Sequence, residues 1–243
     1  MKNLWYNFIN FLFPFKCIKC RTFVYNDSIF CHQCWQLVEF ISEPCCYICS
    51  NPLEFSFNIP KNLQVCASCH KEKPLFNKLI SVFKYTDNIK NIILNFKYYD
   101  KTMLAKPFAK LISNKLIDYH TKDFHIVTAV PLHRKKLRQR MYNQASLLAK
   151  QIANNLNIIF IPDLLIREKF NASQTNYTKK MRMKNIQGAF HINTKYKNII
   201  NNKNILLIDD VITTGATLNE CCKILKKNHC LSITAATIAK RVL

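Results

Sequence analysis

The segment from Ile205 to Leu218, which reads ILLIDDVITTGATL, holds the residues whose types and spacing best define a chemistry. Four apolar residues predict a buried strand, and two adjacent carboxylates, Asp209 and Asp210, follow where we expect that strand to leave its sheet. Two charges at such a place are costly unless a ligand or ion pairs with them. A simpler alternative is that the aspartates cap the following helix, but a cap needs one acid and not two.

A turn of small residues follows the aspartates and predicts an anion site. Its members are Thr213, Thr214, Gly215, Ala216 and Thr217. Such a turn presents backbone N–H groups, hydroxyls and a helix N-terminus to one anion, and the glycine lets the backbone come close. The segment therefore favours a phosphate at the turn and a diol or a metal ion at the aspartates.

Eight cysteines form four Cys-x-x-Cys pairs, a spacing that is typical of zinc knuckles. The predicted metal ligands are Cys17, Cys20, Cys31, Cys34, Cys46, Cys49, Cys66 and Cys69. Consecutive knuckles would pair into two four-thiolate sites, which leave no open position and so indicate structural zinc, one or two ions. Three alternatives stay open: Cys45 could replace Cys46, His32 or His70 could replace a thiolate, or the cysteines could be reduced and metal-free.

Composition excludes several function classes. Gly188 and Gly215 are the only glycines, so the glycine-rich dinucleotide fingerprint and the P-loop are both absent. The net charge of +22 is uneven, because residues 1–80 carry 8 basic and 5 acidic side chains and the remainder carries 28 and 9. The basic part suggests phosphates or nucleic acid as a partner, although lysine can also simply maintain solubility.

The apolar stretch from Leu4 to Phe15 is too short to span a bilayer and lacks a small-residue cleavage site. We therefore expect no signal peptide, no membrane span and a cytoplasmic protein, in which the twelve cysteines stay reduced.

The elements that must position these residues follow a strand and helix alternation after Pro74. Helical spacing predicts helices around residues 89–96, 108–116 and 218–225, and a further helix is expected over 142–156. Apolar runs predict strands over 124–130, 158–161, 205–208 and 231–238. A basic loop should precede the helix over 142–156. The pattern predicts an α/β fold with a parallel sheet covered on both faces and a ligand at the carboxyl ends of its strands. We place the boundary between a small zinc-ribbon domain, 1–78, and the second domain, 79–243, within residues 75–82.

The strand, the two acids and the TTGAT-like turn resemble the phosphoribosyl pyrophosphate (PRPP) signature of type I phosphoribosyltransferases. Three more segments resemble elements of ComF-type proteins: AVPLHRKKLRQRMYNQASLLA at 129–149, REKFNASQTNYTKKMRMKNIQGAF at 167–190 and FKYYDKTMLA at 96–105. With the cysteine knuckles, the resemblance to the ComF family covers nearly the whole chain. This sequence departs from the family at Tyr99 and Met141, where glycine is usual.

This resemblance implies a type I phosphoribosyltransferase-like fold and a role for each predicted site residue. Asp209 and Asp210 would act at the ribose hydroxyls, with magnesium nearby, and residues 213–217 would hold the sugar phosphate. The leaving pyrophosphate would meet a basic loop of Leu132, His133, Arg134 and Arg140, and a second, closing loop would bring Lys179, Lys180 and Arg182.

Two functions of different classes follow from the resemblance. In the first, the protein keeps a PRPP site as a sensor or scaffold and handles incoming single-stranded DNA during natural transformation, with an ATP-dependent DNA translocase of the competence machinery as a further partner. In the second, it is an active phosphoribosyltransferase that releases pyrophosphate from PRPP, including the case of an ordinary enzyme of nucleotide metabolism. No general base or acceptor can be identified from the sequence.

Overall fold

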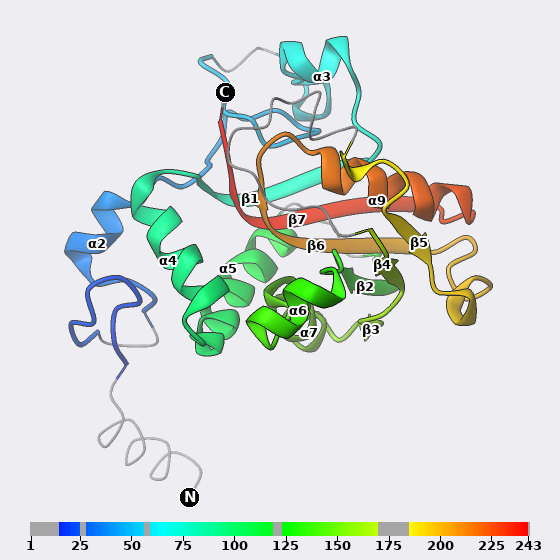
Figure 1. The fold of residues 1–243 in the computed structure, drawn as a ribbon. Helices are drawn as coiled ribbons and strands as arrows, with labels where there is room; N and C mark the ends of the chain where they lie inside the picture. Colours follow the sequence, from blue (N-terminus) through cyan, green and yellow to red (C-terminus); the bar gives the residue numbers. More distant parts are fainter. Residues whose placement is uncertain (1–14, 25–27, 56–58, 119–122, 170–184, 243) are drawn as a thin grey trace, which may run out of the picture.

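A parallel sheet of five strands forms the centre of the computed structural model, which describes residues 15–24, 28–55, 59–118, 123–169 and 185–242 (Figure 1). From one edge to the other, the strands are β1 (Lys78–Lys84), β7 (Ser232–Lys240), β6 (Asn204–Ile212), β2 (Ile126–Ala129) and β3 (Ile159–Phe160). Every neighbouring pair is parallel. The central strands are apolar on both faces because helices or loops cover both sides of the sheet.

The remaining elements are helices and a small second sheet. The described α-helices are α2 (His32–Leu37), α3 (Ala67–Lys71), α4 (Asp87–Tyr98), α5 (Ala105–Asp118), α6 (Arg134–Arg140), α7 (Gln144–Leu156) and α9 (Ala216–Lys227). Single turns of 3-10 helix are η1 (Lys61–Leu63), η2 (Thr102–Leu104) and η3 (Thr194–Tyr196), and a separate antiparallel pair joins β4 (Leu165–Arg167) to β5 (Phe190–Ile192). No helix within these described ranges combines the length and apolar character needed to cross a bilayer.

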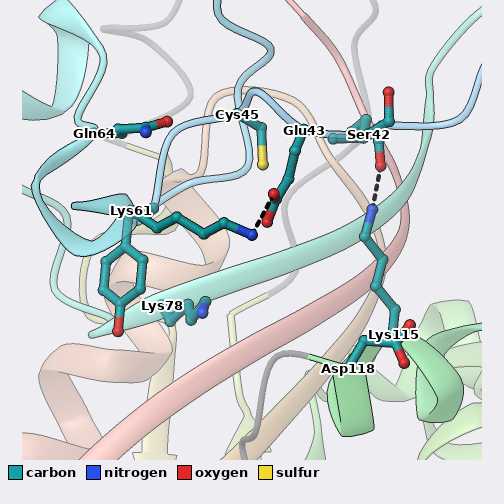
Figure 2. Close-up of a pocket in the computed structure, with 10 residues that line it drawn as sticks. Ser42, Glu43, Cys45, Lys61, Gln64, Lys78, Lys115 and Asp118 are labelled. Carbon is teal, nitrogen blue, oxygen red and sulfur yellow. Dashed lines mark hydrogen bonds and ion pairs between the residues drawn. The ribbon is translucent and has the colours of Figure 1, made fainter. Parts of the chain in front are cut away.

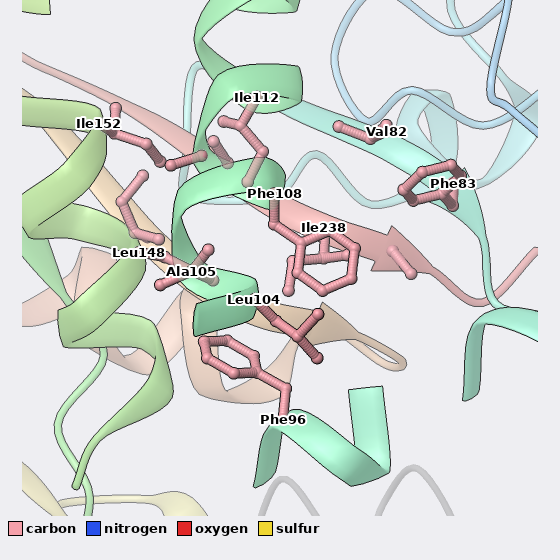
Figure 3. Close-up of a cluster of buried hydrophobic side chains, with 14 of the residues drawn as sticks. Val82, Phe83, Phe96, Leu104, Ala105, Phe108, Ile112, Leu148, Ile152 and Ile238 are labelled. Atoms are coloured by element: carbon pink, nitrogen blue, oxygen red, sulfur yellow. The ribbon is translucent and has the colours of Figure 1, made fainter. Parts of the chain in front are cut away.

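The larger core layer lies where α4, α5 and α7 pack on one face of the sheet (Figure 3). Phe83 of β1, Phe96 of α4 and Phe108 of α5 are almost completely buried. The ring of Phe108 has its centroid 6.5 Å from that of Phe83 and 6.2 Å from that of Phe96. On the opposite face, α9 buries Leu218 and Leu225 in a second layer.

The cysteine-rich segment docks on the free edge of β1. The backbone N–H of Ile41 donates to Val82 O, and that of Lys84 donates to Glu39 O, both at 2.8 Å. Nearer the start of the strand, Leu79 N donates to Ile48 O at 2.7 Å. An unpaired strand edge is prone to join other chains, so these contacts protect the sheet as well as attaching the segment.

The structure confirms the predicted α/β fold and its alternation of strands and helices, with three corrections. A strand, β1, lies in the region expected to be only a domain boundary, and it forms because partners on both sides satisfy its backbone. The expected basic loop contains the helix α6, capped at its start by His133. Strand β6 runs on to Ile212, so the two aspartates lie within it and not at its exit. The division at residue 78 stays a prediction.

Candidate functional site

The two aspartates lie where β6 loses one of its neighbouring strands. Pairing with β2 ends at Ala129 and Ile208, whereas pairing with β7 continues to Ile212 and Lys240. Among the described residues, no strand therefore pairs with this edge of β6 from residue 209 onward. This is the carboxyl end of the parallel sheet, where ligands of open α/β folds bind.

Both carboxylate oxygens of Asp210 are bound by other side chains of the protein. Its side chain is only 7% exposed, and its Oδ1 lies 3.0 Å from the Lys97 ammonium. Its Oδ2 accepts a hydrogen bond from Gln144 Nε2 at 2.5 Å. Burial opposes the charge on Lys97, but the Asp210 carboxylate outweighs it and raises the pKa of Lys97, so the ammonium group stays charged. Asp210 thus joins the end of α4 and the start of α7 to β6.

Asp209 differs from Asp210 in its hydrogen bonding and in its pKa. Its Oδ1 accepts a hydrogen bond from the Asp210 backbone N–H at 2.8 Å. Burial, followed by repulsion from the Asp210 carboxylate, raises the pKa of Asp209 to about 7. A cation or the hydroxyl groups of a ligand would stabilise the charged form of a carboxyl group with such a raised pKa.

The small-residue turn closes round Asp209. Residues 213–217 and Asp209 line the same small pocket, so the structure brings together the members of the predicted phosphate and diol sites. Gly215 has φ +74°, a left-handed conformation that favours glycine, and it is the N-cap of α9. The N-terminus of this twelve-residue helix faces the pocket with its partial positive charge.

Among the described residues, four cations gather near the carboxylates, and the sequence analysis identified only Arg140 as a site residue. Lys97 and Arg167 both act on Asp209 electrostatically, and Lys136 has Arg167, Arg140 and Lys97 as its charged neighbours. Burial, and then these three cations, lower the pKa of Lys136. Such a concentration of positive charge favours a ligand with several negative charges.

Arg167 offers a buried donor that suits an anionic ligand. Its Nε is buried and has no hydrogen-bond partner among the residues that the structure describes. Buried donors without a partner are rare in native proteins, and an anion in the site would supply an acceptor. The sequence signal was weak, because a single arginine after the apolar run of β4 looks like any strand end.

The residues of the predicted pyrophosphate loop have different positions and contacts in the structure. Leu132 and His133 follow β2, and His133 Nδ1 accepts a hydrogen bond from Lys135 N at 3.1 Å to start α6. Arg140 packs its guanidinium 4.5 Å from the centre of the Tyr98 ring and donates to its hydroxyl at 2.7 Å, whereas Arg134 is exposed. Lys179, Lys180 and Arg182 lie outside the described residues.

The two departures from the expected glycines have different structural consequences. Met141 has φ +64° in the left-handed region, so this turn does use the conformation that glycine adopts at least cost. Its side chain is 82% exposed, so it lies in solvent. Tyr99 has φ −123°, which any residue adopts.

The cysteines form two clusters with the predicted membership. The sulfur atoms of Cys17, Cys20, Cys31 and Cys34 lie within 4.8 Å of one another, and so do those of Cys46, Cys49, Cys66 and Cys69. A zinc tetrahedron with bonds of about 2.3 Å has sulfur–sulfur edges of about 3.8 Å. The Cys20–Cys31 and Cys49–Cys66 sulfur separations, 3.5 and 3.7 Å, match that size. Both clusters therefore fit structural zinc, and Cys46 rather than Cys45 takes the place in the second.

Comparisons with known proteins cover both parts of the chain. Residues 8–70 match the double zinc ribbon domain, and residues 143–242 match the phosphoribosyl transferase domain. Competence protein F of Haemophilus influenzae is 30% identical over 220 residues, which cover 88% of this chain and 92% of that protein. Competence protein ComFC of Bacillus subtilis is 24% identical over 215 residues, 88% of this chain and 85% of ComFC. DNA utilization protein YhgH of Salmonella typhimurium is 23% identical over 172 residues, 69% of this chain and 74% of YhgH.

The adjacent cysteines offer a matched test of the second metal cluster. We expect the purified chain to hold two zinc ions, Cys46→Ser to hold one, and Cys45→Ser to keep both, because only Cys46 belongs to the cluster. Native mass spectrometry would count the ions. Loss of zinc in Cys45→Ser with retention in Cys46→Ser would show that the ligands are exchanged.

The raised pKa of Asp209 predicts a pH-dependent cost to folding. Unfolding lowers this pKa to its ordinary value, so the wild type should lose stability as pH rises from about 4 to about 7. Asp209→Asn removes the buried charge, and we expect it to raise the free energy of unfolding by roughly 2 kcal/mol at pH 8 and by less at pH 5. Urea denaturation at both pH values measures this. Exposed Asp87 supplies the control variant, Asp87→Asn, and an equal effect of the two variants at both pH values would refute the prediction.

Proposed function

Because this chain belongs to the competence protein F family, we propose that it binds PRPP at the Asp209 pocket and handles incoming single-stranded DNA during natural transformation. The names of its relatives, two competence proteins and a DNA utilization protein, support the DNA role. The match to the phosphoribosyl transferase domain supports the PRPP role. We propose a cytoplasmic protein in which the zinc-ribbon domain, 1–78, is a scaffold for the second domain, 79–243.

One observation carries the PRPP proposal: a carboxylate, a phosphate-type turn and an excess of cations meet at one open strand end. In our proposal, Thr213, Thr214, Gly215, Ala216 and Thr217 bind the sugar phosphate through backbone N–H groups and hydroxyls. Asp209 accepts hydrogen bonds from the ribose hydroxyls. Asp210 is a positioning residue, since its two oxygens are already bound by Lys97 and Gln144.

The diphosphate of PRPP would lie toward the cations. Arg140, Lys136 and Arg167 can share its charge, and Arg167 Nε would gain the acceptor that the described residues do not provide. Leu132, His133 and Arg134 precede Lys136 and Arg140 on the connection that follows β2. Lys179, Lys180 and Arg182 stay a sequence prediction for a closing loop.

Magnesium fits the donor set of this site. It prefers oxygen ligands and is usually bound by one or two carboxylates together with substrate phosphates, which Asp209 and PRPP would supply. When bound, it would neutralise charge on the leaving pyrophosphate. The ionised form of Asp209 is the one that can act, and the nearby Lys97 and Arg167 favour that form.

The DNA role has support from the surface beside this pocket. Tyr98 and Tyr99 are 52% and 67% exposed at the end of α4, and Arg140 stacks on Tyr98. Helix α6 carries five basic residues among seven, including exposed Lys135 and Arg138. Exposed aromatic rings beside backbone-binding cations are the usual means of holding single-stranded nucleic acid. An ATP-dependent DNA translocase of the competence machinery is a further proposed partner.

The second candidate is an active phosphoribosyltransferase that transfers the sugar of PRPP to an acceptor and releases pyrophosphate. Its support is that the Asp209 carboxylate and the phosphate-type turn line one pocket. Turnover needs an acceptor, so pyrophosphate release during incubation with mixed bases, amines and oligonucleotides distinguishes an enzyme from a PRPP sensor.

Calorimetric titration of PRPP with magnesium tests the proposal. We expect the zinc-loaded wild type to bind PRPP and Asp209→Ala to bind it at least tenfold more weakly. A tenfold loss corresponds to about 1.4 kcal/mol of binding free energy, which is what the loss of a hydrogen bond to a charged group typically costs. Asp87→Ala, which removes an exposed acid on α4, should bind as the wild type does. Absence of binding by the wild type, or equal binding by Asp209→Ala, would contradict a PRPP site here.

The salt dependence of DNA binding tests the role of α6. We expect the affinity for an oligothymidine to fall with salt, and the slope against log salt to decrease by about 1.4 when Lys135 and Arg138 become alanine, because each phosphate contact contributes about 0.7. The matched control replaces exposed Lys195 and Lys197 with alanine and should leave the slope unchanged. Equal slopes in both double variants would place the DNA elsewhere.

A further inference from the structure

Helix α6 presents basic side chains on two of its faces. Lys136 and Arg140 are one helical turn apart and are half-buried, whereas Arg134 and Arg138, also one turn apart, are exposed. The half-buried pair belongs to the group of cations near the two carboxylates of β6. One short helix therefore borders both the candidate site and the outer surface of the protein.

Arg140 is the residue at which this outer surface and the candidate site meet. Its guanidinium lies 4.5 Å from the centre of the Tyr98 ring and donates to the Tyr98 hydroxyl at 2.7 Å. Arg140 also acts electrostatically on Lys97, whose ammonium group lies 3.0 Å from Asp210 Oδ1. The same guanidinium is thus within reach of an anion on either side.

The surface on the outer side has the composition that single-stranded nucleic acid requires. Tyr98 and the next residue, Tyr99, are both exposed at the end of α4, and Met141, which follows Arg140, is exposed as well. Nucleobases stack on exposed aromatic rings, and neighbouring cations bind the phosphates of the strand. The occupant that fits this surface in both shape and charge is a DNA strand.

The charge balance near the carboxylates limits how many anions this region can hold. Among the described residues, four cations stand against the two carboxylates, a net charge of +2 when all six groups are ionised. A phosphomonoester alone carries about −2 at neutral pH, and the diphosphate of PRPP adds further negative charge. Bound PRPP would therefore remove the positive excess that attracts the phosphates of DNA.

We propose that single-stranded DNA and PRPP exclude each other at Arg140, so that PRPP releases DNA from the surface formed by Tyr98, Tyr99 and α6. This inference rests on the proposed function, because both ligands must bind. Without PRPP, the guanidinium stacks on Tyr98 and is available to a DNA phosphate. With PRPP, its N–H groups bind the diphosphate, which arginine holds in a bidentate manner. The PRPP pocket thereby becomes a control of DNA binding.

A larger cavity elsewhere in the protein is less suited to either ligand. Its volume is about 550 Å³, and it lies between the cysteine-rich segment, β1 and α5 (Figure 2). Its lysines are accompanied by acids: Lys61 pairs with Glu43 at 2.5 Å, and both Asp118 and Glu43 act electrostatically on Lys115. These carboxylates would repel a ligand with several negative charges, so we assign the exclusion to the region of Arg140.

Fluorescence anisotropy of a labelled oligothymidine, at constant ionic strength and magnesium concentration, tests the exclusion. We expect saturating PRPP to raise the Kd of the zinc-loaded wild type for DNA at least about fivefold, within the usual range of coupling between two sites. Because such coupling is reciprocal, saturating oligothymidine should raise the Kd for PRPP by the same factor. Both measurements use the wild type, so neither depends on the folding of a variant.

Three variants show whether the effect has the proposed origin. Asp209→Ala should respond more weakly to the same PRPP concentration, which excludes a general salt effect. Arg140→Gln should weaken the binding of each ligand and reduce the coupling factor by at least about half, because the shared group is lost. Arg138→Gln, at an exposed position of the same helix, is the matched control and should weaken DNA binding with the coupling factor unchanged.

The outcomes separate this inference from the function on which it rests. If each ligand binds alone but PRPP leaves the Kd for DNA unchanged or lowers it, the exclusion is refuted and the proposed function stands. The same holds if Arg140→Gln and Arg138→Gln keep equal coupling factors. If PRPP does not bind in the absence of DNA, or DNA does not bind in the absence of PRPP, the proposed function and the exclusion are both refuted.

Discussion

Asp210 is a buried carboxylate within the central strand β6, so its charge must be balanced by other groups. The groups that balance it link the elements round the candidate site. The Lys97 ammonium from α4 and the Gln144 amide from α7 each take one oxygen of this side chain. Removing one member of a buried ion pair typically costs about 3–5 kcal/mol, because the other charge is left uncompensated. The positions of α4, α7 and β6 are therefore coupled, and the neighbouring carboxylate of Asp209 is left for a ligand.

The asymmetry between the two acids has a geometric origin. Successive side chains of a strand point to opposite faces, so Asp210 enters the layer covered by α4 and α7 while Asp209 faces the other way. In addition, pairing with β2 ends at Ile208, so no described strand is paired with β6 beside Asp209 on that edge. Desolvation and the adjacent charge then keep its pKa high until a cation or hydroxyl group arrives.

The cysteine-rich segment is part of the sheet's packing as well as a metal-binding module. Cys17 and Cys34 contribute to the core layer of α4 and α5, whereas the second cysteine cluster contributes to the layer of α9. The segment thus passes round the edge of β1 and contacts both faces. Two four-thiolate zinc sites would leave about −2 of charge each, so this end of the molecule would contrast with the basic surface of α6.

The sequence by itself determined the features that depend on local spacing. Cys-x-x-Cys pairs, the TTGAT turn after two acids and the apolar periodicity of α4, α5, α7 and α9 each specify a short-range geometry, and the structure contains all of them. Tertiary structure decided that β1 is a strand, that Lys97 and Gln144 occupy Asp210, and that Arg167 approaches Asp209. These contacts join residues far apart in the chain, so no local sequence pattern encodes them. A side chain becomes buried, and its charge needs a partner, only when the elements that carry these residues pack together.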